Sequence, residues 1–249
     1  MTADGTSGGD RWRFEDPGTD FPYYDGRPVA LTTRQWWLVV AAVAVAFAVL
    51  IAPIRGLNGT YTQLIPALVF AALPLAVLAW AAPGHWTALF RRVRARDVGW
   101  MVGFWLLNLV VTFVVGGLVS VVFGTKANPA VEGVGDLDTA GRVMFFLKTL
   151  PQLLGEELLT VLPFLALLTW LHTRKNLSRK RAVLLSWLLT ALMFGALHLP
   201  TYDWQVAQAL IGIGAARVVL TAAYIKTKNL WVSTGAHVLN DWSLFALAL

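Results

Sequence analysis

The sequence predicts an all-α fold, namely a polytopic transmembrane helical bundle with about seven membrane-spanning helices. Of its 249 residues, 57% are hydrophobic and 14% are charged, whereas soluble proteins average about 45–50% and about 25%. The mean hydropathy is +0.62. Several apolar runs are long enough for helices that cross a hydrocarbon core of about 30 Å, whereas barrel strands would need only about 10 alternating residues. These observations exclude a water-soluble globule and favour helices.

The expected elements begin after a polar segment. Residues 1–33 contain Gly, Asp and Pro without helical periodicity, so we expect a disordered tail. The first apolar run begins near Gln35, too late for a signal peptide, and is long enough to remain in the bilayer. The expected spans cover residues 35–54, 62–82, 98–123, 143–171, 182–199, 204–224 and 230–249. We therefore divide the chain into the tail, N-terminal transmembrane helices over 34–142 and a C-terminal transmembrane region over 143–249.

The basic residues are distributed unevenly between the connections. Lys and Arg number 15 in the tail and in the connections after the second, fourth and sixth spans, against 3 in the other connections. Basic residues concentrate on the cytoplasmic side of membrane proteins. The bias predicts a multi-pass protein of the plasma membrane with a cytoplasmic N-terminus and an external C-terminus. It also explains the net charge of +6 without a nucleic-acid partner.

Seven ionisable groups lie inside the expected spans, where each charged group costs about 2.5–3.5 kcal/mol. They are Lys148, Glu156, Glu157, His198, Arg217, His237 and Asp241. One interpretation is that they pair across helices and only stabilise the bundle. The other is that they form a site, because such groups usually mark function in membrane spans.

Spacing along the helices favours a site. Glu156 and Glu157 are separated by about 100° of helix rotation, so one can face a cavity while the other takes a supporting partner. His237 and Asp241 are one turn apart and share a helix face. An acid and two histidines on three helices could activate a water, stabilise an oxyanion or hold a metal.

The residue types narrow the chemistry without choosing among these roles. The chain has no cysteine, which removes thiolate metal sites and cysteine nucleophiles. It also lacks the H-E-x-x-H and G-x-S-x-G patterns of zinc peptidases and serine hydrolases. A zinc ion would have to be held by Glu156, His198 and His237.

Three motifs in order resemble the CPBP family of intramembrane endopeptidases, also called the CAAX protease and bacteriocin-processing (Abi) family. The family pattern is E-E-x-x-x-R, then F-x-x-x-H, then H-x-x-x-N/D on successive helices. This chain has Glu156-Glu157-Leu-Leu-Thr-Val161, Phe194-Gly-Ala-Leu-His198 and His237-Val-Leu-Asn240-Asp241. The resemblance covers residues 151–241.

The resemblance implies catalytic roles for Glu156, Glu157, His198, His237 and Asp241. Glu156 and His198 would activate a water for attack on a peptide carbonyl, and His237 with Asp241 would bind the oxyanion. The expected partners are the lipid bilayer and a peptide or membrane-protein substrate, and no cofactor is required. The sequence does not indicate an oligomeric state or the side from which substrate enters.

One departure from the family pattern, and the choice of Asp where much of the family has Asn, carry expectations of their own. Val161 stands where the family has arginine, so we expect Arg217 to be the charge partner of Glu157. A carboxylate cannot donate to an oxyanion unless it is protonated. Asp241 must therefore carry a proton or orient His237, with Asn240 as the second choice for a donor.

Two other functions remain open at this point. The missing arginine is compatible with a non-proteolytic immunity or scaffold protein of the same fold. Intramembrane Glu, His and Asp also occur in proton-coupled carriers, although the chain shows no inverted repeat of the kind that carriers often have.

Overall fold

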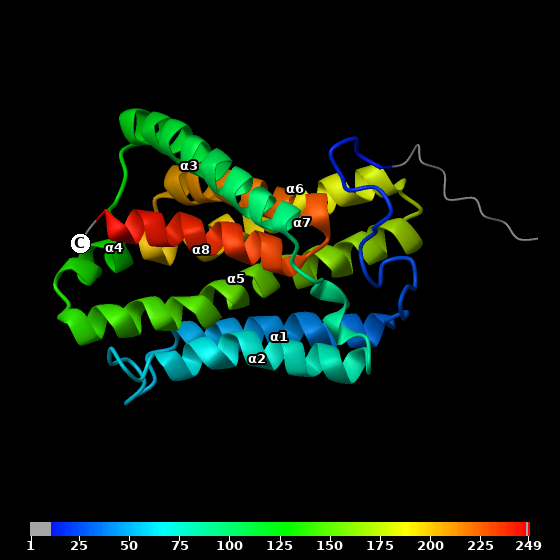
Figure 1. The fold of residues 1–249 in the computed structure, drawn as a ribbon, viewed down its shortest axis with the longest axis horizontal. Coiled ribbons are helices and arrows are strands. Elements are labelled where there is room, and N and C mark those ends of the chain that lie inside the picture. Colours follow the sequence, from blue (N-terminus) through cyan, green and yellow to red (C-terminus); the bar gives the residue numbers. More distant parts are fainter. Residues whose placement is uncertain (1–10, 248) are drawn as a thin grey trace, which may run out of the picture.

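The computed structural model describes residues 11–247 and 249, which form a helical bundle without strands (Figure 1). The α-helices are α1 (Thr33–Ile51), α2 (Leu64–Ala81), α3 (Ala95–Phe123), α4 (Pro129–Gly135), α5 (Thr139–Thr173), α6 (Arg179–Leu197), α7 (Gly214–Thr227) and α8 (Leu230–Ala246). Short 3-10 helices cover Trp86–Leu89 and Pro200–Tyr202, and the π-helix η4 (Gln208–Ile213) leads into α7. The predicted fold class is confirmed.

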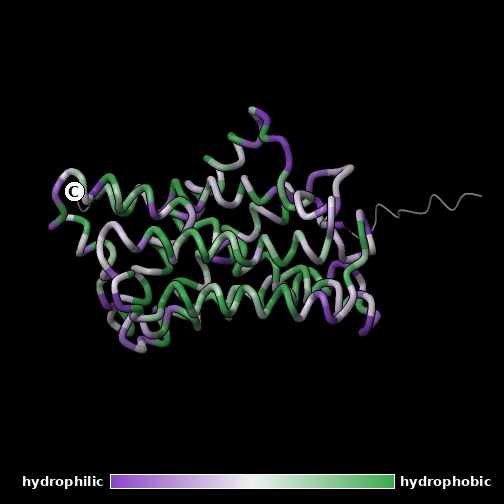
Figure 2. Tube along the Cα trace, turned by 90° about the horizontal axis from the view of Figure 1, so that it is seen from below, coloured by the Kyte–Doolittle hydropathy of each residue, from purple (hydrophilic) through white to green (hydrophobic). Residues whose placement is uncertain are grey.

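Six described helical segments are long and apolar enough to cross a membrane: α1, α2, α3, α5, α6 and the continuous run Gln208–Thr227. The helix α8 corresponds to the seventh expected span and has 17 residues. The short α4 lies between the third and fourth expected spans and was not anticipated. Figure 2 shows hydrophobic colour along the helices and hydrophilic colour at both ends of the bundle, as membrane insertion requires.

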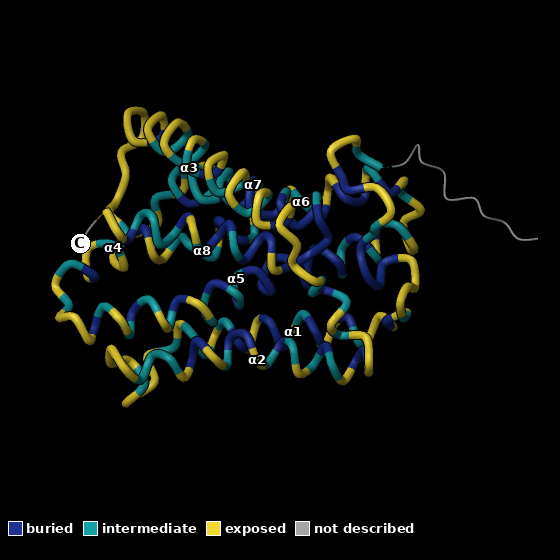
Figure 3. The backbone as a smooth tube through the Cα atoms, in the orientation of Figure 1, coloured by how far each residue is buried: buried dark blue, intermediate teal, exposed yellow. Residues whose placement is uncertain are grey.

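The helix α5 forms the centre of the bundle. It packs against the antiparallel pair α1 and α2 on one side and against α6 and α8 on the other. In its most apolar 18-residue window 72% of the residues are buried, against 11% in α3. Figure 3 shows α3 as a largely exposed helix that crosses over α7 and α8. Among these six segments α5, which carries Glu156 and Glu157, is therefore the one best shielded from lipid.

Polar caps fix where α5 and α8, two of the three motif-bearing helices, begin. The Asp138 side chain accepts from the Gly141 backbone N–H at the start of α5, and Asn229 accepts from Trp231 N–H at the start of α8. These oxygens satisfy N–H groups that have no partner within the helix. The caps thus set the position of each motif along its helix.

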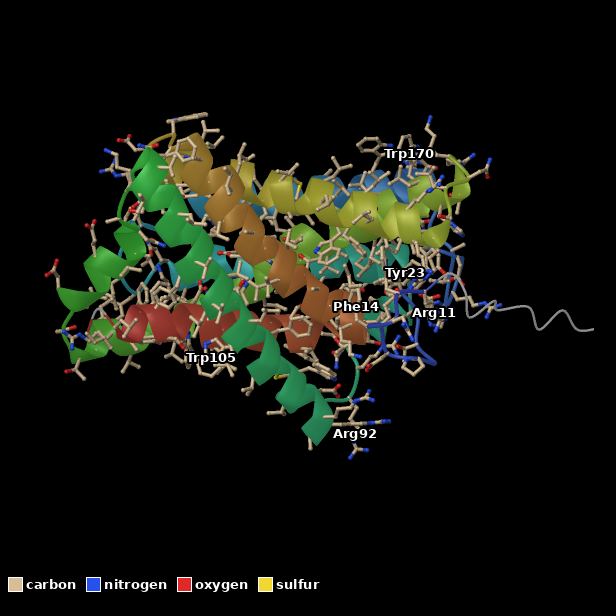
Figure 4. The ribbon with its side chains drawn as sticks, turned by 90° about the horizontal axis from the view of Figure 1, so that it is seen from above. Arg11, Phe14, Tyr23, Arg92, Trp105 and Trp170 are labelled. Atoms are coloured by element: carbon tan, nitrogen blue, oxygen red, sulfur yellow. The ribbon has the colours of Figure 1, made fainter. Side chains whose placement is uncertain are left out.

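The expected disorder of the N-terminal tail is wrong for residues 11–32, which pack over one end of the bundle (Figures 1 and 4). Phe21 and Tyr23 are 2% and 1% exposed. Glu15 accepts hydrogen bonds from Arg179 and Lys228. Composition suggested disorder because the segment is polar, but its acids meet basic partners that follow the spans. Residues 1–10 of the expected tail lie outside the described residues.

Candidate active site

A cavity of about 680 Å³ lies between α3, α5, α8 and the run from η4 into α7. Its lining includes five residues predicted for the site, namely Glu156, His198, Arg217, His237 and Asp241. It also includes the second-choice donor Asn240. The remaining predicted residue, Glu157, is fully buried behind this surface. The structure thus brings residues from four helices to one place.

The two adjacent glutamates face different surroundings. The Glu156 side chain is 13% exposed and lines the cavity, where it accepts a hydrogen bond from Gln152 Nε2 at 3.1 Å. The Glu157 side chain is 0% exposed. The rotation of about 100° between neighbouring helix positions separates them. One acid can therefore meet a substrate while the other holds the site together.

Arg217 is the cationic partner of Glu157. Its Nη1 donates to Glu157 Oε1 at 2.6 Å, and both side chains are 0% exposed. The guanidinium lies 3.9 Å from the ring centroid of Phe194. Val161, which stands at the family's arginine position, is buried in the hydrophobic core. The positive charge beside Glu157 thus comes from α7 instead of α5.

His237 connects the buried ion pair to the cavity. Its Nδ1 lies 2.9 Å from Glu157 Oε1, and an ionised carboxylate can only accept a hydrogen bond. Arg217 Nη2, which can only donate, lies farther from Nδ1, at 3.3 Å, so we assign the Nδ1 hydrogen to the shorter contact with Glu157. Nε2 lies 3.8 Å from Glu156 Oε2 and 3.7 Å from Asp241 Oδ1. Glu157 orients the ring so that Nε2 points toward the two carboxylates of the cavity.

His198 ends α6, and its ring is also held in one orientation. Nδ1 lies 2.8 Å from the backbone oxygen of Phe194, which can only accept, so Nδ1 carries the hydrogen and Nε2 has the free lone pair. Gly195 lets this end of α6 approach η4, because a Cβ there would lie 2.5 Å from the Ala209 oxygen. The close contact fixes where His198 enters the cavity.

Sequence reasoning missed two amides that contact the predicted residues. Asn108, on α3, donates to Asn240 Oδ1 at 3.0 Å, and Asn240 Nδ2 donates to Asp241 Oδ1 at 3.0 Å. Gln152 contacts Glu156 from one turn earlier on α5. Asn108 is the one amide side chain in the apolar run 98–123, and Gln152 stands at i−4 of a predicted catalytic acid. Both signals were visible in the sequence.

The remaining ionisable group expected inside the spans lies away from the cavity. Lys148 donates to Gln63 Oε1 at 2.5 Å. It therefore links α5 to the start of α2.

The described residues contain no group of three His, Asp or Glu side chains arranged to hold a metal ion. Within the suggested zinc set of Glu156, His198 and His237, the two histidines turn Nδ1 toward Phe194 O and Glu157, respectively. Nε2 of each ring then remains for other contacts, as in a metal-ligating histidine, so the zinc set stays a prediction.

One family model matches the part of the chain that contains this site. Residues 139–243 match the family model described as Rce1-like, type II CAAX prenyl endopeptidase Rce1-like. No curated protein and no solved structure matches the chain. The matched region runs from the first residue of α5 into α8 and contains all three motifs. Residues 139–243 are thus similar to the Rce1-like endopeptidases, in agreement with the CPBP resemblance of the three motifs.

Proposed function

We propose that this protein is an intramembrane endopeptidase that hydrolyses a peptide bond with a water activated by Glu156. The observation that carries the proposal is that two adjacent acids have different surroundings and partners. Glu156 faces the cavity, whereas Glu157 is ion-paired to Arg217 and bonded to His237. A carboxylate can act as a general base only if a water can reach it, and of the two glutamates Glu156 is the one that lines the cavity.

His198 supports the activation of the water in this proposal. Its Nε2 lone pair can accept a hydrogen bond from the water, because Nδ1 donates to Phe194 O. The proton taken from the water then passes to the leaving amine of the substrate. Glu156 and His198 come from different helices, so their joint orientation of the water depends on the close contact of Gly195 with η4.

His237 is the proposed donor to the oxyanion. Its Nδ1 hydrogen is directed at Glu157, so the ring donates from Nε2 only when both nitrogens are protonated. Asp241, 3.7 Å from Nε2, orients that side of the ring. Asn240 is the alternative donor, but one of its amide hydrogens is already bonded to Asp241. We therefore assign the main oxyanion contact to His237.

We further propose that the reaction is independent of a metal and that the protein lies in the plasma membrane with its N-terminus cytoplasmic. The support is that base and oxyanion donor are accounted for by side chains, and that basic residues concentrate in alternate connections. Full activity of the purified enzyme after treatment with a chelator supports the first point. Loss of activity that zinc restores contradicts it.

The test is a comparison of new N-termini in membrane and secreted fractions from cells that carry wild type or Glu156→Gln at equal abundance. The matched control is Glu132→Gln, an exposed acid in α4. We expect peptide ends that occur with wild type and with Glu132→Gln but not with Glu156→Gln. Such ends would identify the substrate as well as the activity.

The second candidate is a non-proteolytic immunity or scaffold protein, favoured by Val161 in the motif. This function predicts identical N-terminal profiles for wild type and Glu156→Gln in cells that show the biological effect of the protein. Identical profiles under those conditions would contradict the peptidase proposal and favour the scaffold.

A further inference from the structure

A second cavity, of about 990 Å³, lies outside the candidate active site. It runs between α1, the second half of α5 and residues 23–33 of the N-terminal segment. Thr33, Trp36, Trp37 and Val40 of α1 and Pro163, Ala166, Leu167 and Trp170 of α5 line it, and each of these sets repeats at the spacing of one helix face. The polar side chains of Thr169, His172 and Thr173 also line the α5 side, toward the end of that helix. The cavity is therefore a groove between two facing helices.

The groove has the dimensions of a site for a lipid chain. It extends along α5 from Pro163 to Arg174, which is about 16 Å at 1.5 Å per residue. Its inner part is lined by apolar side chains and includes the small residue Ala166, which leaves room between the helices. Because α5 spans the membrane, the groove runs from the hydrocarbon region to the surface of the bilayer.

The outer end of the groove is basic and aromatic. Arg174 lines it, is exposed and has no ion pair with another described residue. Lys175 lies 5.0 Å from the ring centroid of Trp170. Trp37 and Trp170 are 70% and 45% exposed, as residues of an interfacial belt are. Figure 4 shows Trp170 at the same end of the molecule as Tyr23 of the N-terminal segment. One carboxylate, Asp25, also lines the groove.

We propose that this groove binds one anionic glycerophospholipid of the surrounding bilayer. One acyl chain lies between α1 and α5, and the phosphate lies at Arg174, with Lys175 nearby. An arginine without a carboxylate partner matches a phosphate in charge and geometry. Asp25 would repel a second negative charge on the headgroup, so we expect a headgroup with a single net negative charge.

The test is native mass spectrometry of the full chain, released from bilayers of equal parts phosphatidylglycerol and phosphatidylcholine with identical chains. We expect one retained lipid and a preference for phosphatidylglycerol. Arg174→Gln should reduce that preference about fivefold, the contribution of one basic residue near an anionic surface. Arg181→Gln, an exposed residue of the same basic connection, is the matched control and should leave the preference unchanged.

A second pair of variants tests the chain-binding part. Ala166→Phe should fill the groove and lower retention of both lipids, whereas Leu189→Phe on the exposed face of α6 should not. Equal retention of the two lipids by wild type, or equal effects of Arg174→Gln and Arg181→Gln, would overturn the proposal. Because lipid retention is measured without substrate, the outcome is independent of the proposed peptidase activity.

Discussion

Two clusters of buried or half-buried ionisable groups lie in different parts of this bundle. The end cluster is formed by Glu15, Asp20, Arg179 and Lys228, where the N-terminal segment packs on the helices. The central cluster is formed by Glu157, Arg217 and His237. The end cluster borders neither cavity described above, whereas Arg217 and His237 of the central cluster line the candidate active site. Burial of charge therefore does not identify a site; access from the buried charge to a cavity does.

The end cluster satisfies its own hydrogen-bonding groups. Burial by itself would raise the pKa of Glu15, but hydrogen bonds from Arg179, Lys228 and the Trp12 backbone outweigh it and lower the pKa to about 2. Burial is also the main reason that the pKa of Lys228 falls to about 8, against the opposing effect of Glu15. The cluster joins a segment without regular secondary structure to α6 and to the connection between α7 and α8, which is a structural role.

The largest expected effect comes from breaking the central ion pair with Arg217→Met. Removing one partner of a buried pair leaves a charge without compensation and typically costs about 3–5 kcal/mol. Cleavage of the substrate should fall as well, because Glu157 without its cationic partner no longer holds His237 in position. Thermal unfolding in detergent and cleavage of the identified substrate measure the two effects.

The double variant Glu157→Met with Arg217→Met separates stability from function in that cluster. Replacing both charges by apolar side chains should recover most of the lost stability, but not the activity, since His237 keeps no anchor at Nδ1. An Arg217→Ala protein that folds and retains full activity with an unchanged pH profile would refute the positioning role of this arginine.

Arg179→Gln makes the corresponding change in the end cluster and should have a smaller effect. Arg179 bonds Glu15 and Asp20, but these acids keep hydrogen bonds from Lys228 and Tyr24. Hydrogen bonds to charged groups contribute about 1.5–3 kcal/mol each. Because the glutamine amide can still donate to one of the two acids, we expect a net loss equal to about one such bond, about 1.5–3 kcal/mol. Limited proteolysis should cut residues 11–32 faster.

Activity per folded molecule is the control for this comparison. It should stay unchanged in Arg179→Gln, because the end cluster does not border the candidate active site. A loss of activity as large as that of Arg217→Met, at equal folded fraction, would show that the two clusters do not differ in function.

The two clusters also differ in how far the sequence predicts them. The central cluster is accessible to prediction because a charge in an apolar run needs a partner, and Arg217 is the one arginine inside the expected spans. The end cluster was not, because Glu15 and Asp20 lie in a polar segment where acids are ordinary. Nothing in local composition indicates that these acids meet Arg179, some 160 residues later.

Other features depend on packing that periodicity does not encode. The apolar runs predict the spans, since the length of a membrane helix is set by the bilayer. They do not predict which face of α3 meets α8, so the contact of Asn108 with Asn240 was missed. The π-helical turns of η4 and the groove between α1 and α5 likewise arise from contacts between helices.

Acidification should weaken the packing of the N-terminal segment at the end cluster within a defined pH range. The pKa of Glu15 is about 2 in the folded protein against an ordinary value of 4.5. A carboxyl group whose pKa is lower in the folded than in the unfolded protein stabilises the fold fully at a pH above its unfolded-state pKa. This stabilisation is lost as the pH falls through the folded-state pKa. Protease sensitivity of residues 11–32 should therefore rise between about pH 4.5 and pH 2.

Glu15→Gln removes this titration and is the control for it. The variant should show a smaller change in protease sensitivity across the same pH window, from a higher starting level at neutral pH. An equal pH dependence in both proteins would assign the effect to other acids of the segment.

The substitution with the smallest expected effect on stability, Asn108→Leu, tests whether α3 contributes to the candidate active site. Asn108 donates to Asn240, and such bonds between membrane helices average about 0.6 kcal/mol. Its own carbonyl oxygen is buried without a hydrogen-bond partner among the described residues, so Asn108→Leu removes a cost together with a bond. Stability should thus change by less than about 1 kcal/mol in either direction.

Activity should nevertheless fall several-fold in Asn108→Leu, mainly in kcat, because Asn240 would lose the bond that holds its amide toward Asp241. Leu106→Ala, a change on the exposed part of the same helix, should leave kcat unaltered. Equal kcat values for the two variants would confine the catalytic arrangement to α5–α8 and leave α3 as a cover of the cavity. A selective loss would instead make α3, which lies outside the family-matched residues 139–243, part of the machinery that positions the site.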